Sequence, residues 1–216
     1  MVGKERIRSF IRSEDGISMT EALIIMPIVL LVITAMIEFG ILVLQWNQSV
    51  KALQVGARLL AVSTPLVDDY EDLGDFGGTI GEGEPVPSGV ASTGCGAGAP
   101  VACPSARLNR LMTGGDGTCE PTTPAIDRLV GVCDVAPWIR PENLQVTYSR
   151  AGLGYVGRPA GPVTTITLEL KNQTFEFVLL GALLEYFTGG TFSNVPMPPN
   201  AVTITSEDLS DCRTAC

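Results

Sequence analysis

The chain has 216 residues, 45% of them hydrophobic, with a formal net charge of -9 and no histidine. This acidic balance argues against nucleic acid as a partner, because phosphate groups require neutralisation by lysine and arginine. The lack of histidine removes the commonest general base and metal ligand, and no catalytic or nucleotide-binding motif occurs in a suitable context. We therefore expect no enzymatic activity, no catalytic residue, no metal and no cofactor.

The N-terminal quarter contains a basic leader followed by a long apolar run. Residues 22–44 hold one ionisable side chain, Glu38, and a helix of about 20 apolar residues is enough to cross a bilayer core. Lys and Arg residues are concentrated before this run, so the positive-inside rule predicts a cytoplasmic N-terminus. The run is longer than the core of a secretory signal peptide, and no small-residue cleavage site follows it.

The apolar segment contains two glutamates, one at its start and one inside it. Glu21 opens the run, and in one interpretation it merely lies at the interface, where the positive end of the helix dipole favours an acid. In the other, it pairs with a free α-amino group on Ile17, created by cleavage after Gly16, in the same chain or a neighbour. Glu38 lies about four turns further along, so we expect it near the outer interface, solvated or paired with another chain.

The stretch KERIRSFIRSEDG, followed by ISMTEALIIMPIVLLVITAMIEFGILVLQ, resembles the TadE-like family. These are pseudopilins of the tight-adherence (Flp) pilus machinery, akin to type IV pilin-like proteins. The resemblance rests on the basic leader ending in Gly16, on Glu21, on Pro27 within the run and on IEFG near its end. The KALQVGARLLAVS stretch also resembles the helix that follows the membrane segment in the family. Together these features cover approximately residues 5–64.

The resemblance implies cleavage between Gly16 and Ile17 by a prepilin peptidase, with Glu21 as the fifth residue of the mature chain. It implies a minor pilin or pseudopilin that assembles or primes a pilus, with Glu21 and Glu38 as assembly residues. The implied partners are the inner membrane, the peptidase, other pilin subunits and the pilus assembly platform, and not nucleic acid. The implied location is the bacterial inner membrane, with a single pass and a periplasmic C-terminal domain, or an extracellular pilus. The alternative is an uncleaved membrane-anchored periplasmic domain that binds an envelope component.

All six cysteines follow the apolar run, which fits disulfides in an oxidising compartment. Zinc is the competing interpretation, but the chain has no histidine and no CxxC pair. Six cysteines permit 15 pairings. Short separations suggest the pairs Cys95–Cys103, Cys119–Cys133 and Cys212–Cys216.

The sequence predicts an α+β fold, a long N-terminal helix laid against a small antiparallel sheet. We expect a leader at 1–16, a transmembrane and shaft helix at 17–64, a disulfide-stapled acidic and Gly/Pro-rich loop region at 65–125, and a periplasmic domain at 126–216. Pro65 should stop the shaft helix. Within the loop region, the acidic stretch 68–75 is interpreted as a solvated loop rather than a calcium site, because it lacks the EF-hand pattern.

Further elements are expected in the second half of the chain. Residues 105–112 should form a short helix capped by Ser105. Alternating apolar residues predict strands at 144–150, 163–170 and 201–205. The apolar stretch 175–187 is too short to span a bilayer, and we expect a buried or membrane-proximal helix there.

Overall fold

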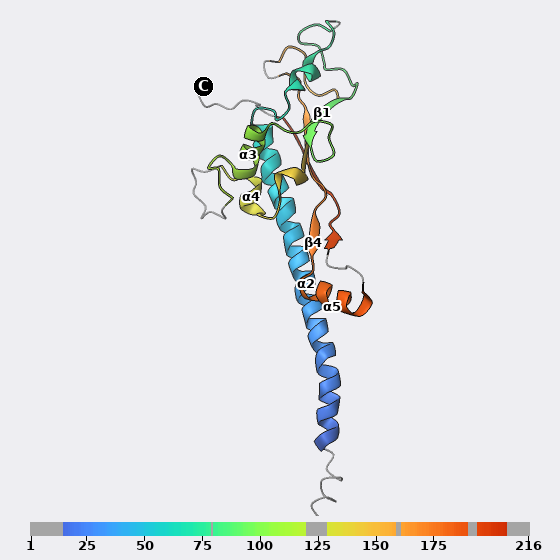
Figure 1. Ribbon diagram of the computed structural model, residues 1–216. Helices are drawn as coiled ribbons and strands as arrows, with labels where there is room; N and C mark the ends of the chain where they lie inside the picture. Colours follow the sequence, from blue (N-terminus) through green and yellow to red (C-terminus); the bar gives the residue numbers. More distant parts are fainter. Residues whose placement is uncertain (1–14, 79, 120–128, 159–160, 190–193, 207–216) are drawn as a thin grey trace, which may run out of the picture. The chain divides into compact units, whose positions relative to one another are not determined.

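The computed structural model of the chain describes residues 15–78, 80–119, 129–158, 161–189 and 194–206 (Figure 1). The fold is mixed α+β, with a long N-terminal helix and an antiparallel sheet, as the sequence predicts. The chain divides into two compact units, each built from two segments. Unit 1 comprises Met1–Val43 and Glu176–Val195, and unit 2 comprises Leu44–Phe175 and Pro196–Cys216.

Helix α2 spans Asp15–Ala61 and contains Pro27. It ends three residues before the predicted Thr64. Its last turn tightens, since the backbone N–H groups of Val62 and Ser63 each bond to the carbonyl three residues earlier, at 3.4 Å in both cases. Pro65 then disfavours helical geometry for the residue before it. Pro65 thus disfavours continuation of the helix, but the helix ends at Ala61, earlier than predicted.

Unit 2 is built on a four-stranded antiparallel sheet in the order β1-β2-β3-β6. Its strands are β1 (Ala91–Gly96), β2 (Leu144–Arg150), β3 (Thr165–Leu170) and β6 (Asn200–Thr205). The last three are the strands that the alternating pattern predicts. The register opposes Val146 to Leu168, and Leu168 to Val202, so the inward-facing residues of the three strands form rows across the sheet.

The core of unit 2 lies between this sheet and the C-terminal part of α2. Leu144, Val146 and Tyr148 of β2 have no exposed surface, and the intervening residues are only partly buried. Ala52 and Leu53 of α2 belong to the same buried cluster. Each such large apolar side chain contributes about 1.5–3 kcal/mol of burial free energy, which holds the helix on the sheet.

Strand β1 was not predicted, because its sequence ASTGCG lacks the usual strand formers. The two glycines of β1 are needed because a larger side chain would clash with β2. A Cβ on Gly94 would lie 2.6 Å from the carbonyl oxygen of Val146, and one on Gly96 would lie 2.2 Å from that of Leu144. Through this pairing with β2, part of the expected loop region 65–125 is an integral strand of the sheet.

Four further helical segments precede β2 in the described residues of unit 2. They are η1 (Asp69–Gly74), α3 (Ser105–Thr113), α4 (Val132–Val135) and η2 (Pro141–Asn143). Figure 1 shows α3 and α4 beside the C-terminal part of α2. The predicted cap at Ser105 is wrong: Pro104 occupies the N-cap position, Ser105 is already helical, and no side chain caps the helix.

Unit 1 contains the N-terminal part of α2 and helix α5 (Leu179–Thr188). Figure 1 shows α5 crossing α2 rather than running along it. Helix α5 covers most of the predicted apolar stretch 175–187 and ends one residue beyond it. Residues Thr174–Glu176 instead form strand β4, which pairs with β5 (Asn194–Pro196) in a two-stranded sheet. Gly189, with φ of 68°, ends α5 in the left-handed conformation that glycine adopts readily.

Candidate assembly site

The N-terminal part of α2 exposes its apolar side chains. Among the described residues, α2 is the one helix long and apolar enough to cross a membrane, and its most apolar 18-residue window has a mean hydropathy of 2.6 with 6% of that window buried. Soluble monomers rarely expose an apolar surface of this extent. The segment is therefore suited to lipid or to the helices of neighbouring subunits.

The predicted processing site and Glu21 lie at the start of this helix. Gly16 and Ile17 fall within the first turn of α2, and Glu21 is exposed. Ile17 and Glu21 are four residues apart, which is about one turn of the helix. Within the described part of the chain, Glu21 makes no hydrogen bond or ion pair. Its carboxylate is therefore available to a group outside these residues.

Glu38 has a different environment from the one expected. Its side chain is 6% exposed, and both carboxylate oxygens accept hydrogen bonds from backbone N–H groups at the start of α5. The Leu179 N–H donates to Oε1 at 2.5 Å, and the Leu180 N–H donates to Oε2 at 3.1 Å. The expectation of a solvated side chain, or of a partner in another chain, is thus replaced by a partner within this chain.

This arrangement supplies α5 with a cap that its own sequence lacks. The first N–H groups of a helix have no intrahelical acceptor, and Val178 at the N-cap position has no side chain able to accept them. A carboxylate at this end also interacts favourably with the helix dipole. Glu38 therefore accepts the first two N–H groups of α5 and holds this helix against α2.

The sequence separation explains why Glu38's partner was missed. Glu38 and Leu179 are 141 residues apart, and no local pattern links them. Two signals were present: an isolated carboxylate in an apolar helix, and a second apolar helix with no Ser, Thr, Asp or Asn at its N-cap. Each leaves hydrogen-bonding capacity unsatisfied, and together they would have suggested the pairing.

An apolar groove lies between α2 and the first turn of α5. Its volume is about 530 Å³. Among the described residues that line it, Thr34 has the one polar side chain; these residues are Pro27, Ile28, Leu30, Leu31, Thr34, Leu179 and Leu180. The groove is on the N-terminal side of Glu38 along α2, within the apolar run.

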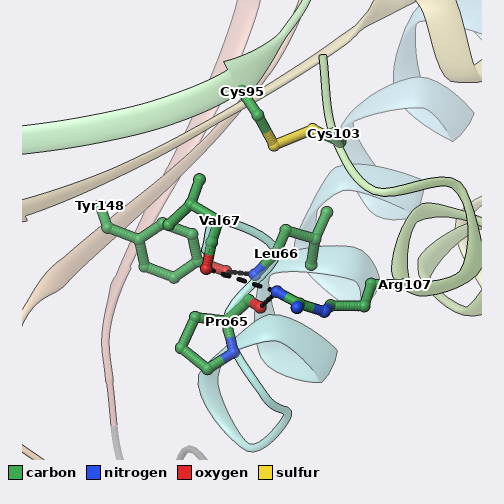
Figure 2. The surroundings of a disulfide bond; sticks show 7 residues. All are labelled: Pro65, Leu66, Val67, Cys95, Cys103, Arg107 and Tyr148. Atoms are coloured by element: carbon green, nitrogen blue, oxygen red, sulfur yellow. Dashed lines mark hydrogen bonds between the residues drawn. A yellow bond between two sulfur atoms is a disulfide. The ribbon is translucent and has the colours of Figure 1, made fainter. Parts of the chain in front are cut away.

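In unit 2, a polar cluster secures the turn that follows α2 (Figure 2). The buried Tyr148 hydroxyl accepts a 3.1 Å hydrogen bond from the Leu66 N–H. The Arg107 guanidinium donates to the Pro65 carbonyl at 2.7 Å and forms a 2.5 Å ion pair with Asp68. Burial raises the pKa of Tyr148 to about 12, so the hydroxyl stays neutral at physiological pH.

The cysteines form two disulfides in the described residues, Cys95–Cys103 and Cys119–Cys133, both as the short separations suggest. The first lies beside the Tyr148 and Arg107 cluster, as Figure 2 shows. Cys212 and Cys216 lie outside the described residues, so their predicted pairing stays a prediction.

The acidic residues of the stretch 68–75 are exposed to solvent, as expected, but the stretch contains the helical segment η1 and makes specific contacts. Asp68 pairs with Arg107, and Asp69 accepts a 2.7 Å hydrogen bond from the Thr93 hydroxyl. Tyr70 and Leu73 of η1 are buried. Throughout the part of the chain that the structure describes, no group of three or more His, Cys, Asp or Glu side chains could hold a metal ion.

Comparison with known families finds a similarity in the N-terminal segment. The family described as TadE-like protein matches residues 16–58. The match begins at Gly16 and covers most of α2, including Glu21 and Glu38. No curated protein and no solved structure matches the chain. Over residues 16–58 the chain is thus similar to the TadE-like protein family.

Proposed function

We propose that this chain is a single-pass membrane pseudopilin or minor pilin that assembles or primes a tight-adherence (Flp) pilus. The observation that carries the proposal is the exposed carboxylate of Glu21 at the start of an exposed apolar helix, inside the segment that matches the TadE-like family. An isolated carboxylate beside hydrocarbon is costly, and such residues usually mark functional sites in membrane helices.

The proposed first step is proteolytic. A prepilin peptidase hydrolyses the peptide bond between Gly16 and Ile17, leaving a carboxylate on the leader and a free α-amino group on Ile17. Glu21 is then the fifth residue of the mature chain. The Glu21 carboxylate of one subunit neutralises the Ile17 ammonium of its neighbour while their apolar helices pack together. Attraction between such opposite charges strengthens as the surrounding dielectric falls.

The different environments of the two glutamates support this assignment. Both oxygens of Glu38 already accept hydrogen bonds from α5, whereas Glu21 is exposed. Glu21 is therefore the better candidate for the intersubunit pair. We assign Glu38 an indirect role in assembly, through the position of α5 on α2.

The proposed topology places the leader in the cytoplasm and unit 2 in the periplasm. The concentration of Lys and Arg before the apolar run supports this orientation. The two disulfides of unit 2 support an oxidising compartment. In this topology, the membrane helix is available to other pilin subunits and to the assembly platform within the inner membrane.

Processing is tested by the intact mass and N-terminal sequence of the protein purified from its native membranes. The proposal predicts a mature chain beginning at Ile17. A chain that retains the leader would contradict processing and would favour the uncleaved, membrane-anchored binding domain. A chain lacking the whole apolar run would contradict both interpretations.

Pilus assembly is tested by Glu21→Ala, which removes the carboxylate and leaves the apolar helix intact. Breaking a desolvated charge pair typically costs about 3–5 kcal/mol, so incorporation into pili should fall by more than about tenfold. Glu71→Ala is the matched control, because it removes an acidic side chain from η1 in unit 2. Normal pilus assembly by a cleaved and stable Glu21→Ala protein would overturn the proposal.

A further inference from the structure

Helix α5 is apolar and exposes large apolar side chains. Val178, just before it, is 75% exposed, and Tyr186 near its end is 84% exposed. Within the ten residues of α5, Glu185 is the single charged side chain. A helix of this length cannot cross a bilayer, which takes about 20 residues. Such a helix requires an apolar partner that it meets along its side.

The hydrogen bonds between Glu38 and the start of α5 fix the position of α5 along the membrane helix. Glu38 follows Glu21 by 17 positions in a continuous helix, which corresponds to about 26 Å at 1.5 Å per residue. The hydrocarbon core of a bilayer is about 30 Å thick. When Glu21 lies at one boundary of this core, Glu38 and the start of α5 lie close to the opposite boundary.

The groove beside α5 adds a second observation. Its lining on α2 comes from Pro27 to Thr34, and these residues precede Glu38, so the groove opens within the depth of the hydrocarbon core. Its apolar lining and volume of about 530 Å³ suit a flexible hydrocarbon chain. The lipid that surrounds the membrane helix is therefore continuous with the space beside α5.

We propose that α5 is an interfacial helix that binds phospholipid in the membrane leaflet opposite the N-terminus. An acyl chain occupies the groove, and Tyr186 lies at the headgroup level, where amphipathic aromatic rings are enriched. Glu38 fixes α5 at this depth by accepting its first two N–H groups. The inference requires α2 to cross a membrane, and it does not depend on leader cleavage or pilus assembly.

Photocrosslinking of the full-length chain tests this inference. The protein is reconstituted into vesicles of phosphatidylethanolamine and phosphatidylglycerol, with a diazirine amino acid replacing Tyr186 or Leu180. Mass spectrometry should detect phospholipid adducts at both positions. The same diazirine at Tyr155 is the matched control, because Tyr155 is also an exposed aromatic residue, at 51%, but belongs to unit 2. Its phospholipid adducts should be at least about tenfold fewer.

A second variant tests whether the lipid adduct at Leu180 requires α5 to be docked beside the groove. Glu38→Ala removes both acceptors of the α5 N–H groups, so the adduct at Leu180 should fall severalfold when α5 leaves the groove. Adducts between Tyr186-substituted chains and a second copy would overturn the proposal in favour of a protein interface. Water addition as the main product at position 186 would overturn it as well. Neither result would bear on Glu21 and pilus assembly.

Discussion

Tyr148 links the sheet of unit 2 to the turn after α2. It is fully buried, its ring packs edge-on against Tyr70 with a centroid distance of 5.4 Å, and its hydroxyl accepts the Leu66 N–H. Burial raises the pKa of both tyrosines above the ordinary value of 10.0, that of Tyr148 to about 12. The raised pKa of Tyr148 therefore makes the stability of unit 2 sensitive to alkaline pH.

The free energy of unfolding of unit 2 should fall as the pH rises from about 10 to about 12. Over this window the unfolded chain loses the Tyr148 proton while the folded chain keeps it, so unfolding releases a proton and is favoured by high pH. The full contribution is present below pH 10 and is lost through about pH 12, at up to about 1.4 kcal/mol per pH unit for one group. Urea denaturation of the full chain in detergent at several pH values, followed by tryptophan fluorescence, measures this slope.

Tyr148→Phe provides the control for that measurement. The variant leaves the Leu66 N–H without its acceptor, so we expect a loss of about 1–3 kcal/mol near neutral pH. It also removes the titrating group, so its alkaline slope should be shallower than that of the unchanged protein. Tyr155→Phe, at an exposed position, should alter neither quantity. Identical slopes for Tyr148→Phe and the unchanged protein would contradict the assignment.

Gly56 is a second residue whose identity the tertiary structure requires. A Cβ at this position would lie 2.7 Å from Val132 Cγ2 and 2.8 Å from Leu168 Cδ2, so the glycine lets α4 and β3 approach α2 closely. We expect Gly56→Val to lower the free energy of unfolding of unit 2 by about 1–3 kcal/mol through overpacking. Gly40→Val in the same helix is the control, because nothing lies within 4 Å of a Cβ there. Equal denaturation midpoints for the two variants would refute the packing argument.

At the scale of elements, α5 depends on a distant side chain for its N-terminal cap. Glu38→Ala should raise the rate of backbone hydrogen exchange in residues 179–188 by about tenfold, since loss of an N-cap costs about 1 kcal/mol or slightly more. Glu38→Gln retains one acceptor oxygen and should have an intermediate effect. Exchange is measured by mass spectrometry on the full chain in detergent.

The control for this prediction lies on α5 itself. Glu185→Ala removes an exposed acid from the C-terminal half of the helix, where a negative charge is unfavourable to the dipole. Its exchange rate should be unchanged or slightly lower. Faster exchange in both variants to the same degree would show that any charge removal loosens α5, and would contradict a specific cap by Glu38.

At the scale of the whole molecule, membrane attachment should depend on the central residues of the apolar run. Introducing Leu30→Arg and Ile33→Arg together should release most of the chain from membranes, because each arginine at a helix centre costs about 2.5–3.5 kcal/mol. The measurement is the fraction that remains in the pellet after alkaline washing. Val62→Arg, exposed but beyond the apolar run, is the control and should stay in the pellet. Retention of the double variant would contradict a membrane-spanning α2.

Local patterns were sufficient for the long helix α2 and for three of the four strands of the main sheet. The period-two alternation around Ile166 and Leu168 predicted β3, and similar patterns predicted β2 and β6, because each strand buries one face. The uninterrupted apolar run predicted the N-terminal part of α2 for an equally local reason. The pattern failed at β1, where glycines are needed for close approach to β2 and leave no apolar alternation to recognise.

The sequence by itself determined the apolar helix, the position of Glu21 at its start and the strands with one buried face, and it suggested the two short-range disulfides. These features depend on residues close together in the chain. The tertiary structure alone decided the partner of Glu38, the docking of α5 and the need for glycine at positions 56, 94 and 96. Those features arise where segments far apart in the chain meet, and backbone N–H groups or packed side chains of one segment then select the residue of another.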